Sequence, residues 1–173
     1  MGLYNDVILP RLCHLVMRNR RLAPYRERVI ASAEGRVLEI GIGSGLNLPF
    51  YGPEVREIVG MEPAPQLIAM ARQVAERMPM PVRFMEESAA AISLDSNTID
   101  TVVTTWTLCT IPEADGALSE IRRVLKPSGR LLFVEHGLAP DEGAGFRFDR
   151  LETAYMPGPK PWSFIYEGSA QSR

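Results

Sequence analysis

The chain lacks the features that mark several specialised classes of protein. Its two cysteines are too few for a disulfide framework and favour a reducing, cytoplasmic location. Neither Cys13 nor Cys109 stands at a metal-ligand spacing from His14 or His136, so we expect no metal site. No apolar run reaches the ~20 residues of a membrane span, and the first residues lack the pattern of a secretory signal. A net charge of -2 argues against a nucleic-acid partner.

The composition is that of one globular domain, with 46% hydrophobic and 23% charged residues in a chain of 173. The charge is uneven, because residues 1–30 hold six arginines against Asp6 and Glu27. A solvated helical face is favoured over contact with a membrane surface or an anionic acceptor. Apolar spacing predicts two helices in residues 1–35, which form an N-terminal helical cap. Whether this cap is a lid over a site or packs at the sheet edge stays open.

Residues 37–47 begin as an apolar run and end in three alternating glycines, which predicts a buried strand that stops at a turn where the backbone approaches a ligand. The alternating glycines of the turn are Gly41, Gly43 and Gly45. The dinucleotide fingerprint needs its third glycine three residues after the second, where Leu46 stands. Glu39, two residues before the first glycine, suits a ligand ammonium group better than a pyrophosphate. The turn therefore favours S-adenosylmethionine over NAD.

Strands and helices alternate after this turn. Strands are predicted over 57–61, 82–85, 99–105 and 130–136, with helices from residue 63 and over 114–125. Glu62 follows the second strand, at the place where doubly wound folds position the acid that binds both ribose hydroxyls. Two further runs, 146–155 and 162–167, predict an antiparallel hairpin.

Four motifs in this order closely resemble those of class I S-adenosylmethionine-dependent methyltransferases. They are LEIGIGSG (38–45), GMEP (60–63), IDTVV (99–103) and RRVLKPSGRLL (122–132). The nearest relatives look to be the type 11 methyltransferase-like group, which includes quinone, phospholipid and thiol methyltransferase-like proteins. The resemblance covers about residues 30–136.

The resemblance implies an α/β fold that is Rossmann-like and doubly wound. Its mostly parallel seven-stranded sheet ends in a C-terminal antiparallel hairpin. It implies a single domain, 1–173, with a cap (1–35), a cofactor-binding core (36–136) and the hairpin (146–173). The implied cofactor is S-adenosyl-L-methionine, with S-adenosyl-L-homocysteine as product. The implied activity is methyl transfer to a small-molecule or lipid-like acceptor.

The resemblance also implies roles for matching residues. Glu39 would hold the methionine ammonium, directly or through water, with the backbone of Gly41 and Gly43 against the cofactor and Asn47 nearby. Glu62 would bind the ribose diol. The adenine would lie beside Pro63, Ser88 and Ala89, and the methionine and acceptor side would be lined by Thr105 and Trp106.

His136 ends the fifth predicted strand and is the candidate general base, because histidine titrates near neutral pH. The alternative is a structural histidine that hydrogen-bonds within the fold. Cys109 has no His or Lys neighbour in the sequence to activate it, so we expect a buried thiol.

Only nine residues, 137–145, separate the fifth predicted strand from the hairpin, although relatives carry a helix there. Parallel connections usually need a dozen or more residues, so this helix is predicted to be missing. A sheet face left bare in this way would favour a partner, and we expect a homodimer, with exchanged hairpins as one form of it.

Two other functions compete with methyl transfer. A regulatory domain that binds S-adenosylmethionine or S-adenosylhomocysteine without catalysis is one, because relatives build part of the acceptor pocket from the missing helix. An NAD-dependent oxidoreductase is the other, and Leu46 and the predicted hairpin oppose it.

Overall fold

A computed structural model describes residues 9–136, 146–155 and 164–172 of the chain. Seven strands form one sheet in the order β3-β2-β1-β4-β5-β7-β6. The strands are β1 (Gly35–Ile40), β2 (Val55–Met61), β3 (Val82–Met85), β4 (Ile99–Thr105), β5 (Leu125–His136), β6 (Phe146–Tyr155) and β7 (Phe164–Ser172). The helices are α1 (Leu9–Met17), α2 (Ala23–Ile30), α3 (Pro65–Ala75) and α4 (Ala114–Val124), with 3-10 turns η2 (Leu48–Phe50) and η3 (Leu108–Thr110).

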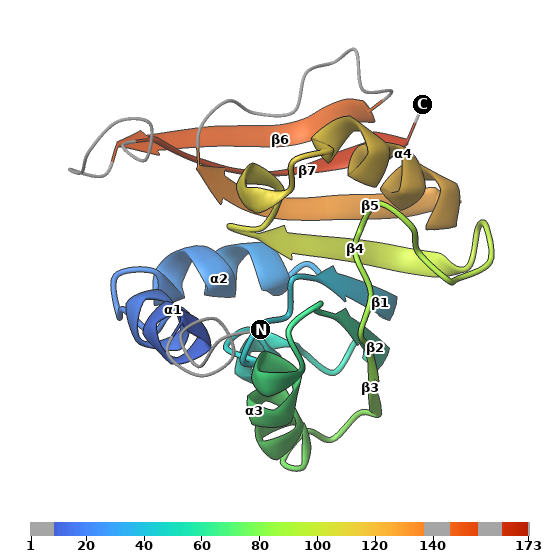
Figure 1. Ribbon diagram of the computed structural model, residues 1–173. Coiled ribbons are helices and arrows are strands. Elements are labelled where there is room, and N and C mark those ends of the chain that lie inside the picture. The colour runs from blue at the N-terminus through green and yellow to red at the C-terminus, as the bar shows by residue number, and fades with distance from the viewer. Residues whose placement is uncertain (1–8, 137–145, 156–163, 173) are drawn as a thin grey trace.

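The first five strands are parallel, and β7 lies antiparallel between β5 and β6. This is the predicted doubly wound sheet with a C-terminal antiparallel hairpin, and the prediction is confirmed (Figure 1). Boundaries shift in places. The strand predicted over 130–136 begins at Leu125, which pairs with Ile99 before the register shifts and Arg130 pairs with Thr101. The helix predicted from Pro63 begins at Pro65.

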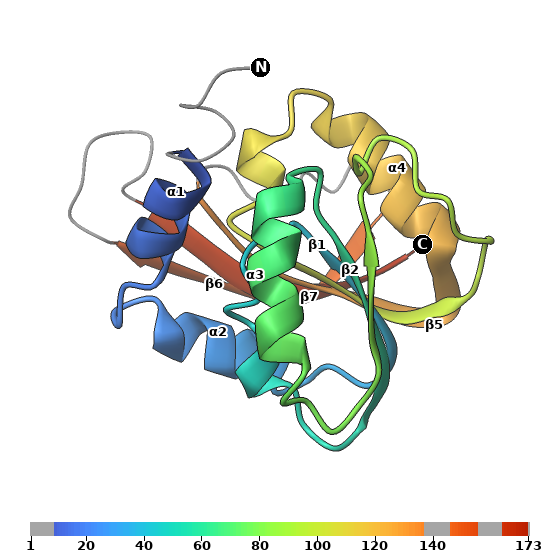
Figure 2. The same ribbon diagram turned by 60° about the horizontal axis from the view of Figure 1, so that its bottom comes forward.

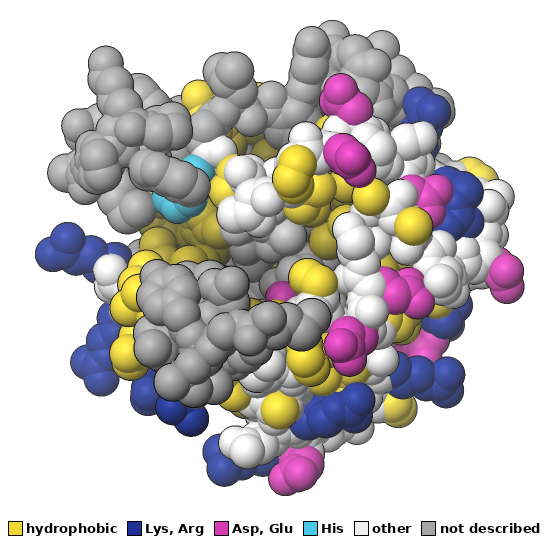
Figure 3. All heavy atoms as spheres, in the orientation of Figure 1, with side chains coloured by type: hydrophobic (Ala, Val, Ile, Leu, Met, Phe, Trp, Pro, Cys, Tyr) yellow, Lys and Arg dark blue, Asp and Glu magenta, His cyan; other side chains and the backbone are white. Residues whose placement is uncertain are grey.

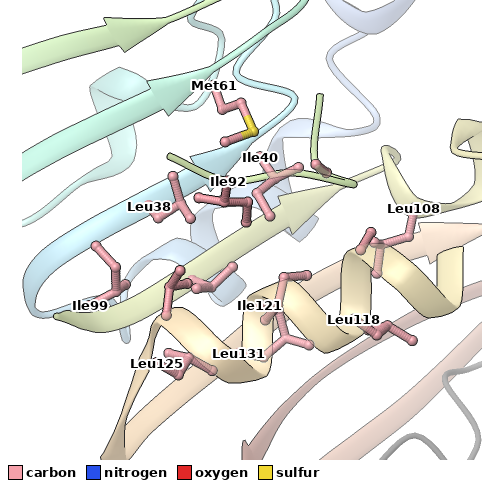
Figure 4. Packing of buried hydrophobic residues seen from close by; sticks show 14 of the residues in the cluster. Leu38, Ile40, Met61, Ile92, Ile99, Leu108, Leu118, Ile121, Leu125 and Leu131 are labelled. Atoms are coloured by element: carbon pink, nitrogen blue, oxygen red, sulfur yellow. The ribbon is translucent and has the colours of Figure 1, made fainter. Parts of the chain in front are cut away.

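The core lies on both faces of the sheet, because side chains alternate along each strand. Leu38 and neighbouring strand residues pack against Leu118 and Ile121 of α4 (Figure 4). On the opposite face, Val37 packs with Val29 and Ile30 of α2. The helices α2 and α3 lie together on that second face, away from α4 (Figure 2).

The connection between β5 and β6 is short, since β5 ends at His136 and β6 begins at Phe146. The predicted loss of a helix falls on residues 137–145, which lie outside the described residues. In the hairpin, β7 residues are buried on both faces: Ile165 packs on the α2 side, and Ala170 packs on the α4 side. Both faces of the sheet therefore bury side chains at β7.

Exposed large apolar side chains gather elsewhere among the described residues. Leu12, Leu15 and Val16 lie on α1 and are 50%, 65% and 61% exposed, while Leu151 lies on the edge strand β6. The helix predicted here is present, but this stripe of it does not pack into the core. No helix in the described ranges combines the length and apolar character that crossing a membrane would require.

Candidate functional site

The glycine-rich turn after β1 adopts a conformation that few residues other than glycine tolerate. Gly41, Gly43 and Gly45 all have positive φ, at +70°, +54° and +77°. A Cβ at Gly41 would collide with the side chain of Thr107, and one at Gly45 would press on Ala71 of α3. A Cβ at Gly43 would meet nothing closer than the Gly41 carbonyl oxygen at 3.8 Å. The space beside Gly43 is therefore open to a ligand.

Glu62 follows β2 and is held beside this turn by backbone donors. Its Oε2 accepts a hydrogen bond from the Gly43 N–H at 3.2 Å, and its Oε1 accepts one from the Ala64 N–H at 3.0 Å. Burial raises the pKa of the Glu62 carboxyl above its ordinary value, and the two backbone hydrogen bonds oppose that rise. The geometry fixes one carboxylate next to the open side of the turn.

Glu39 lies on the α2 side of β1, since strand alternation places it on the same face as Val37. Its Oε1 accepts a hydrogen bond from Asn47 Nδ2 at 2.8 Å, and its Oε2 accepts one from the Tyr51 hydroxyl at 2.8 Å. Burial raises the pKa of Glu39 to about 7, against the lowering effects of Tyr51, Asn47 and the charge of Arg26. Both carboxylate oxygens are thus used by the protein itself.

A cavity of about 460 Å³ opens at the carboxyl ends of β1, β2 and β4. Nine of the ten predicted cofactor-binding residues line it: Gly41, Gly43, Asn47, Glu62, Pro63, Ser88, Ala89, Thr105 and Trp106. Glu39 does not line the cavity and reaches it through Asn47. His136 does not line it either. The volume falls in the range typical of small-molecule sites.

The N-terminal helices form one wall of this cavity. His14 and Met17 of α1 line it, as does Arg26 of α2. His14 Nδ1 lies 2.7 Å from the Ser44 hydroxyl, which connects α1 to the glycine-rich turn. Figure 3 shows a hollow next to α1 in which hydrophobic side chains are exposed. The cap thus occupies the position that a lid requires.

Trp106 comes directly after β4 and has φ +54°, an unusual value for a bulky residue and one that often marks functional sites. Its backbone N–H donates to the Val134 carbonyl at 2.6 Å, which holds the turn. The Arg26 guanidinium stacks on its ring, with Cζ 4.6 Å from the ring centroid. The centroid of the His136 ring lies 6.1 Å from that of the Trp106 ring, and the two rings are tilted by 42°.

A third buried carboxylate, Glu135, positions another part of the cavity lining. Glu135, at the end of β5, accepts hydrogen bonds from the backbone N–H groups of Thr107 and Leu108, both at 3.1 Å. It therefore positions the segment after Trp106, which supplies the cavity residues Thr107, Thr110, Ile111 and Pro112. Cys109 in this segment is exposed, so the expectation of a buried thiol was wrong. The segment leaves β4 as the short turn η3, which carries Cys109 outward.

Sequence reasoning missed several residues that build the site. Arg26 was counted among the arginines of a solvated face, yet it is 4% exposed. The burial of Arg26 could have been predicted from the sequence, because it shares one helical face with the apolar residues Leu22, Val29 and Ile30. His14 and Tyr51 gave no comparable signal, since their partners Ser44 and Glu39 lie in other elements.

A family model for the methyltransferase domain matches residues 38–133 of this chain. Phosphatidylethanolamine N-methyltransferase of Cereibacter sphaeroides is 35% identical over 111 residues, which make up 63% of this chain and 54% of that protein. Human thiol S-methyltransferase TMT1B is 30% identical over 146 residues, or 83% of this chain and 57% of that protein. The chain spans about half the length of these curated relatives.

Among solved structures, a SAM dependent methyltransferase from Aquifex aeolicus superposes with a TM-score of 0.74 at 18% sequence identity. The alignment covers 95% of this chain and 98% of that one. This likeness concerns the fold, and it extends over the sheet and the helices on both of its faces.

Proposed function

Because this chain belongs to the family of the methyltransferase domain, we propose that it transfers a methyl group from S-adenosylmethionine to a small-molecule or lipid-like acceptor. One observation carries the proposal. A carboxylate fixed by backbone donors, Glu62, lies beside the open face of a glycine turn at the tip of the neighbouring strand, and both line one cavity. A diol and a nucleoside that passes close to the backbone fit this arrangement.

The residues present fit this cofactor along its whole length. Glu62 would accept hydrogen bonds from the ribose hydroxyls, with Pro63, Ser88 and Ala89 beside the adenine. The open space at Gly43 would admit the chain that links ribose and methionine. Asn47, oriented by Glu39, would face the ammonium group. When bound, S-adenosylmethionine supplies a methyl group on a cationic sulfur that leaves as a neutral thioether.

The protein's own part in such a transfer is alignment, exclusion of water and removal of a proton from the acceptor. The cap residues His14 and Met17 close one side of the cavity and would keep water from the reacting atoms. Of the two histidines, His14 lines the cavity, whereas His136 does not and contacts the Trp106 ring. We therefore assign proton acceptance to His14 in place of His136.

This assignment is tested by comparing H14Q with H136Q at saturating cofactor. The assignment is supported if kcat falls in H14Q and not in H136Q. The loss in H14Q should become smaller as the pH rises, because the acceptor then ionises without a base. Loss confined to H136Q would return the role of base to His136.

The activity itself is tested with methyl-labelled S-adenosylmethionine and three acceptors of different chemistry: phosphatidylethanolamine vesicles, a small alkyl thiol and a demethylated quinol. We expect repeated turnover with one of them. Stoichiometric binding of the cofactor without transfer to any acceptor would instead support a regulatory domain. Binding of NADH without binding of S-adenosylhomocysteine would overturn both.

The α1 helix suggests how a lipid-like acceptor would meet the site. The exposed Leu12, Leu15 and Val16 share one face, and α1 also lines the cavity. Exposed arginines lie on or just after this helix: Arg11, Arg18, Arg20 and Arg21. A basic helix with an apolar outer face has the character of an interfacial membrane helix. We propose that α1 contacts an anionic lipid surface, which reverses the preference that charge pattern alone favoured.

A homodimer remains our proposal for the assembly, now through the edge strand β6. Its outer edge is unpaired among the described strands, and Leu151 on it is 45% exposed. The hairpin already pairs with β5 of its own chain, so exchange is not needed to complete the sheet. A monomeric mass by light scattering at micromolar concentration would exclude this dimer.

The low cysteine content supports a cytoplasmic location.

A further inference from the structure

Arg26 is a charged residue at a position where the fold calls for an apolar one. It lies on the α2 face that also carries the buried Val29 and Ile30, and it is 4% exposed. Burying a guanidinium is costly unless hydrogen-bonding partners satisfy it. Among the described residues its Nε has no acceptor. Its contacts there are a stack on the Trp106 ring and the field of Glu39.

Stacking leaves the hydrogen-bonding part of Arg26 unused. A guanidinium that lies flat on an aromatic ring engages its planar face, whereas its N–H donors point outward in the plane. Burial lowers the pKa of Arg26 to about 10 against the opposing effect of Glu39, so the group stays charged at neutral pH. Arg26 also lines the cavity, and no other Arg or Lys among the described residues does.

A complementary polar atom, from Asn47, lies in the same cavity. The Asn47 side-chain amide donates to Glu39 Oε1 and, at 2.9 Å, to Thr105 Oγ1. Its Oδ1 is buried and has no donor in the described part of the chain. One cavity therefore carries a cation with an unused donor and, from Asn47, an unused acceptor backed by a carboxylate. An α-amino acid, which carries a carboxylate and an ammonium group, matches this pair.

From this geometry we infer that Arg26 binds the carboxylate of the amino-acid end of S-adenosylmethionine and S-adenosylhomocysteine. The inference rests on the proposed function and adds to it the direction in which the ligand lies. The nucleoside sits at Glu62, and the amino acid points to α2. Trp106 fixes the guanidinium, so the N-terminal cap takes part in cofactor binding as well as covering the site.

The test is a thermodynamic cycle that combines removal of the Arg26 guanidinium with removal of the ligand carboxylate. Calorimetry measures binding of S-adenosylhomocysteine and of its decarboxylated analogue, 5′-adenosyl-3-thiopropylamine, to the wild type and to R26M. A charge-assisted hydrogen bond contributes enough that we expect R26M to lose about 10- to 100-fold in affinity for S-adenosylhomocysteine. Affinity for the decarboxylated analogue, already weak, should stay within about threefold. R26K keeps the charge without the planar fork and should fall between.

The matched control is R28M, since Arg28 lies two residues away on the same helix and pairs with Glu167 outside the cavity. It should bind both ligands as the wild type does. Equal weakening of both ligands by R26M, or no weakening of either, would overturn the inference. If R26M does not fold, the wild type alone still tests the inference: equal affinity of the wild type for both ligands would overturn it. A wild type that binds neither ligand would instead refute the proposed function.

Discussion

At the scale of single residues, the site depends on where each side chain stands relative to its strand. Glu39 was expected to face the ligand because it precedes the glycines. Strand alternation instead turns it under α2, where Asn47 and Tyr51 occupy its oxygens. Glu62 lies beyond the last strand residue, Met61, so alternation no longer fixes its direction and it lines the cavity. The two acids therefore act differently, Glu39 by positioning and Glu62 by contact.

Glu39 predicts a pH dependence of ligand binding. Its pKa of about 7 in the folded protein lies above the ordinary value of 4.5, so the folded state holds the proton longer than the unfolded chain. The contribution of Glu39 to the free energy of unfolding is therefore fully present below about pH 4.5, and it is lost as the pH rises through about 7. An ammonium ligand favours the ionised form, and S-adenosylhomocysteine affinity should rise up to about tenfold between pH 6 and 8.

E39Q checks this reading by calorimetry at both pH values. The variant should bind weakly and with the same affinity at pH 6 and 8. A wild type whose affinity does not change over this range, or an E39Q that keeps the full change, would contradict the role of Glu39.

Gly43 predicts a loss of binding without loss of the fold. In G43A the new methyl group would enter the open space that we assign to the ligand, and the positive φ costs roughly 1–2 kcal/mol. We expect S-adenosylhomocysteine affinity to fall at least about tenfold while the far-UV circular dichroism is kept. G116A is the control, since Gly116 lies in α4 and a Cβ added there would meet nothing within 4 Å; it should gain up to ~1 kcal/mol of stability and bind normally. Unchanged binding by G43A would place the ligand elsewhere.

At the scale of elements, local patterns predicted most of the sheet because each strand carries its own signal. The β-branched run of β4 was found with its observed bounds, Ile99–Thr105, and so was the short β3, Val82–Met85. What local pattern could not predict is contact between distant elements. His14 meets Ser44 across 30 residues, and Arg26 meets Trp106 across the sheet face. Those contacts build one wall of the site.

The α2 helix is joined to the hairpin by a bidentate ion pair, and this predicts a stability effect. Arg28 Nε and Nη2 donate to the two oxygens of Glu167, each at 2.9 Å, and Glu167 is 4% exposed. R28M should lower the free energy of unfolding by about 1–2 kcal/mol, because the buried carboxylate loses its main partner while Arg28 itself is partly solvated. Urea unfolding measures the change. R21M, at an exposed arginine before α2, should leave the midpoint unchanged. An R28M midpoint equal to that of the wild type would show that the pair contributes nothing.

At the scale of the whole molecule, the cavity, the cap and the apolar face of α1 lie on one side. The fold class was predictable from two features of the sequence. Predicted strands and helices alternate along the chain, and the four motifs stand in the order found in class I methyltransferases, which have a doubly wound sheet. The exposed stripe was not, because Leu12, Leu15 and Val16 have the spacing of a core-facing helix and only the packed structure shows them in solvent. Apolar residues have the same helical spacing whether the face they form packs into a core or contacts a membrane.

This arrangement predicts binding to anionic vesicles through α1. The triple variant L12S/L15S/V16S should lose most of its sedimentation with phosphatidylglycerol vesicles and should keep its affinity for S-adenosylhomocysteine. L151S is the control, because it removes an exposed apolar side chain that lies on β6 and not on α1, and it should sediment like the wild type. Equal sedimentation of the triple variant and the wild type, or binding to neutral vesicles alone, would refute the lipid contact.

The central claim is that one nucleoside site lies between the glycine turn and Glu62, and calorimetric titration with S-adenosylhomocysteine tests it most directly. The wild type should bind one ligand per chain, and E62Q, which weakens the acceptor for the ribose diol, should lose about tenfold or more in affinity. A wild type that shows no saturable binding, or an E62Q variant as tight as the wild type, would contradict the claim.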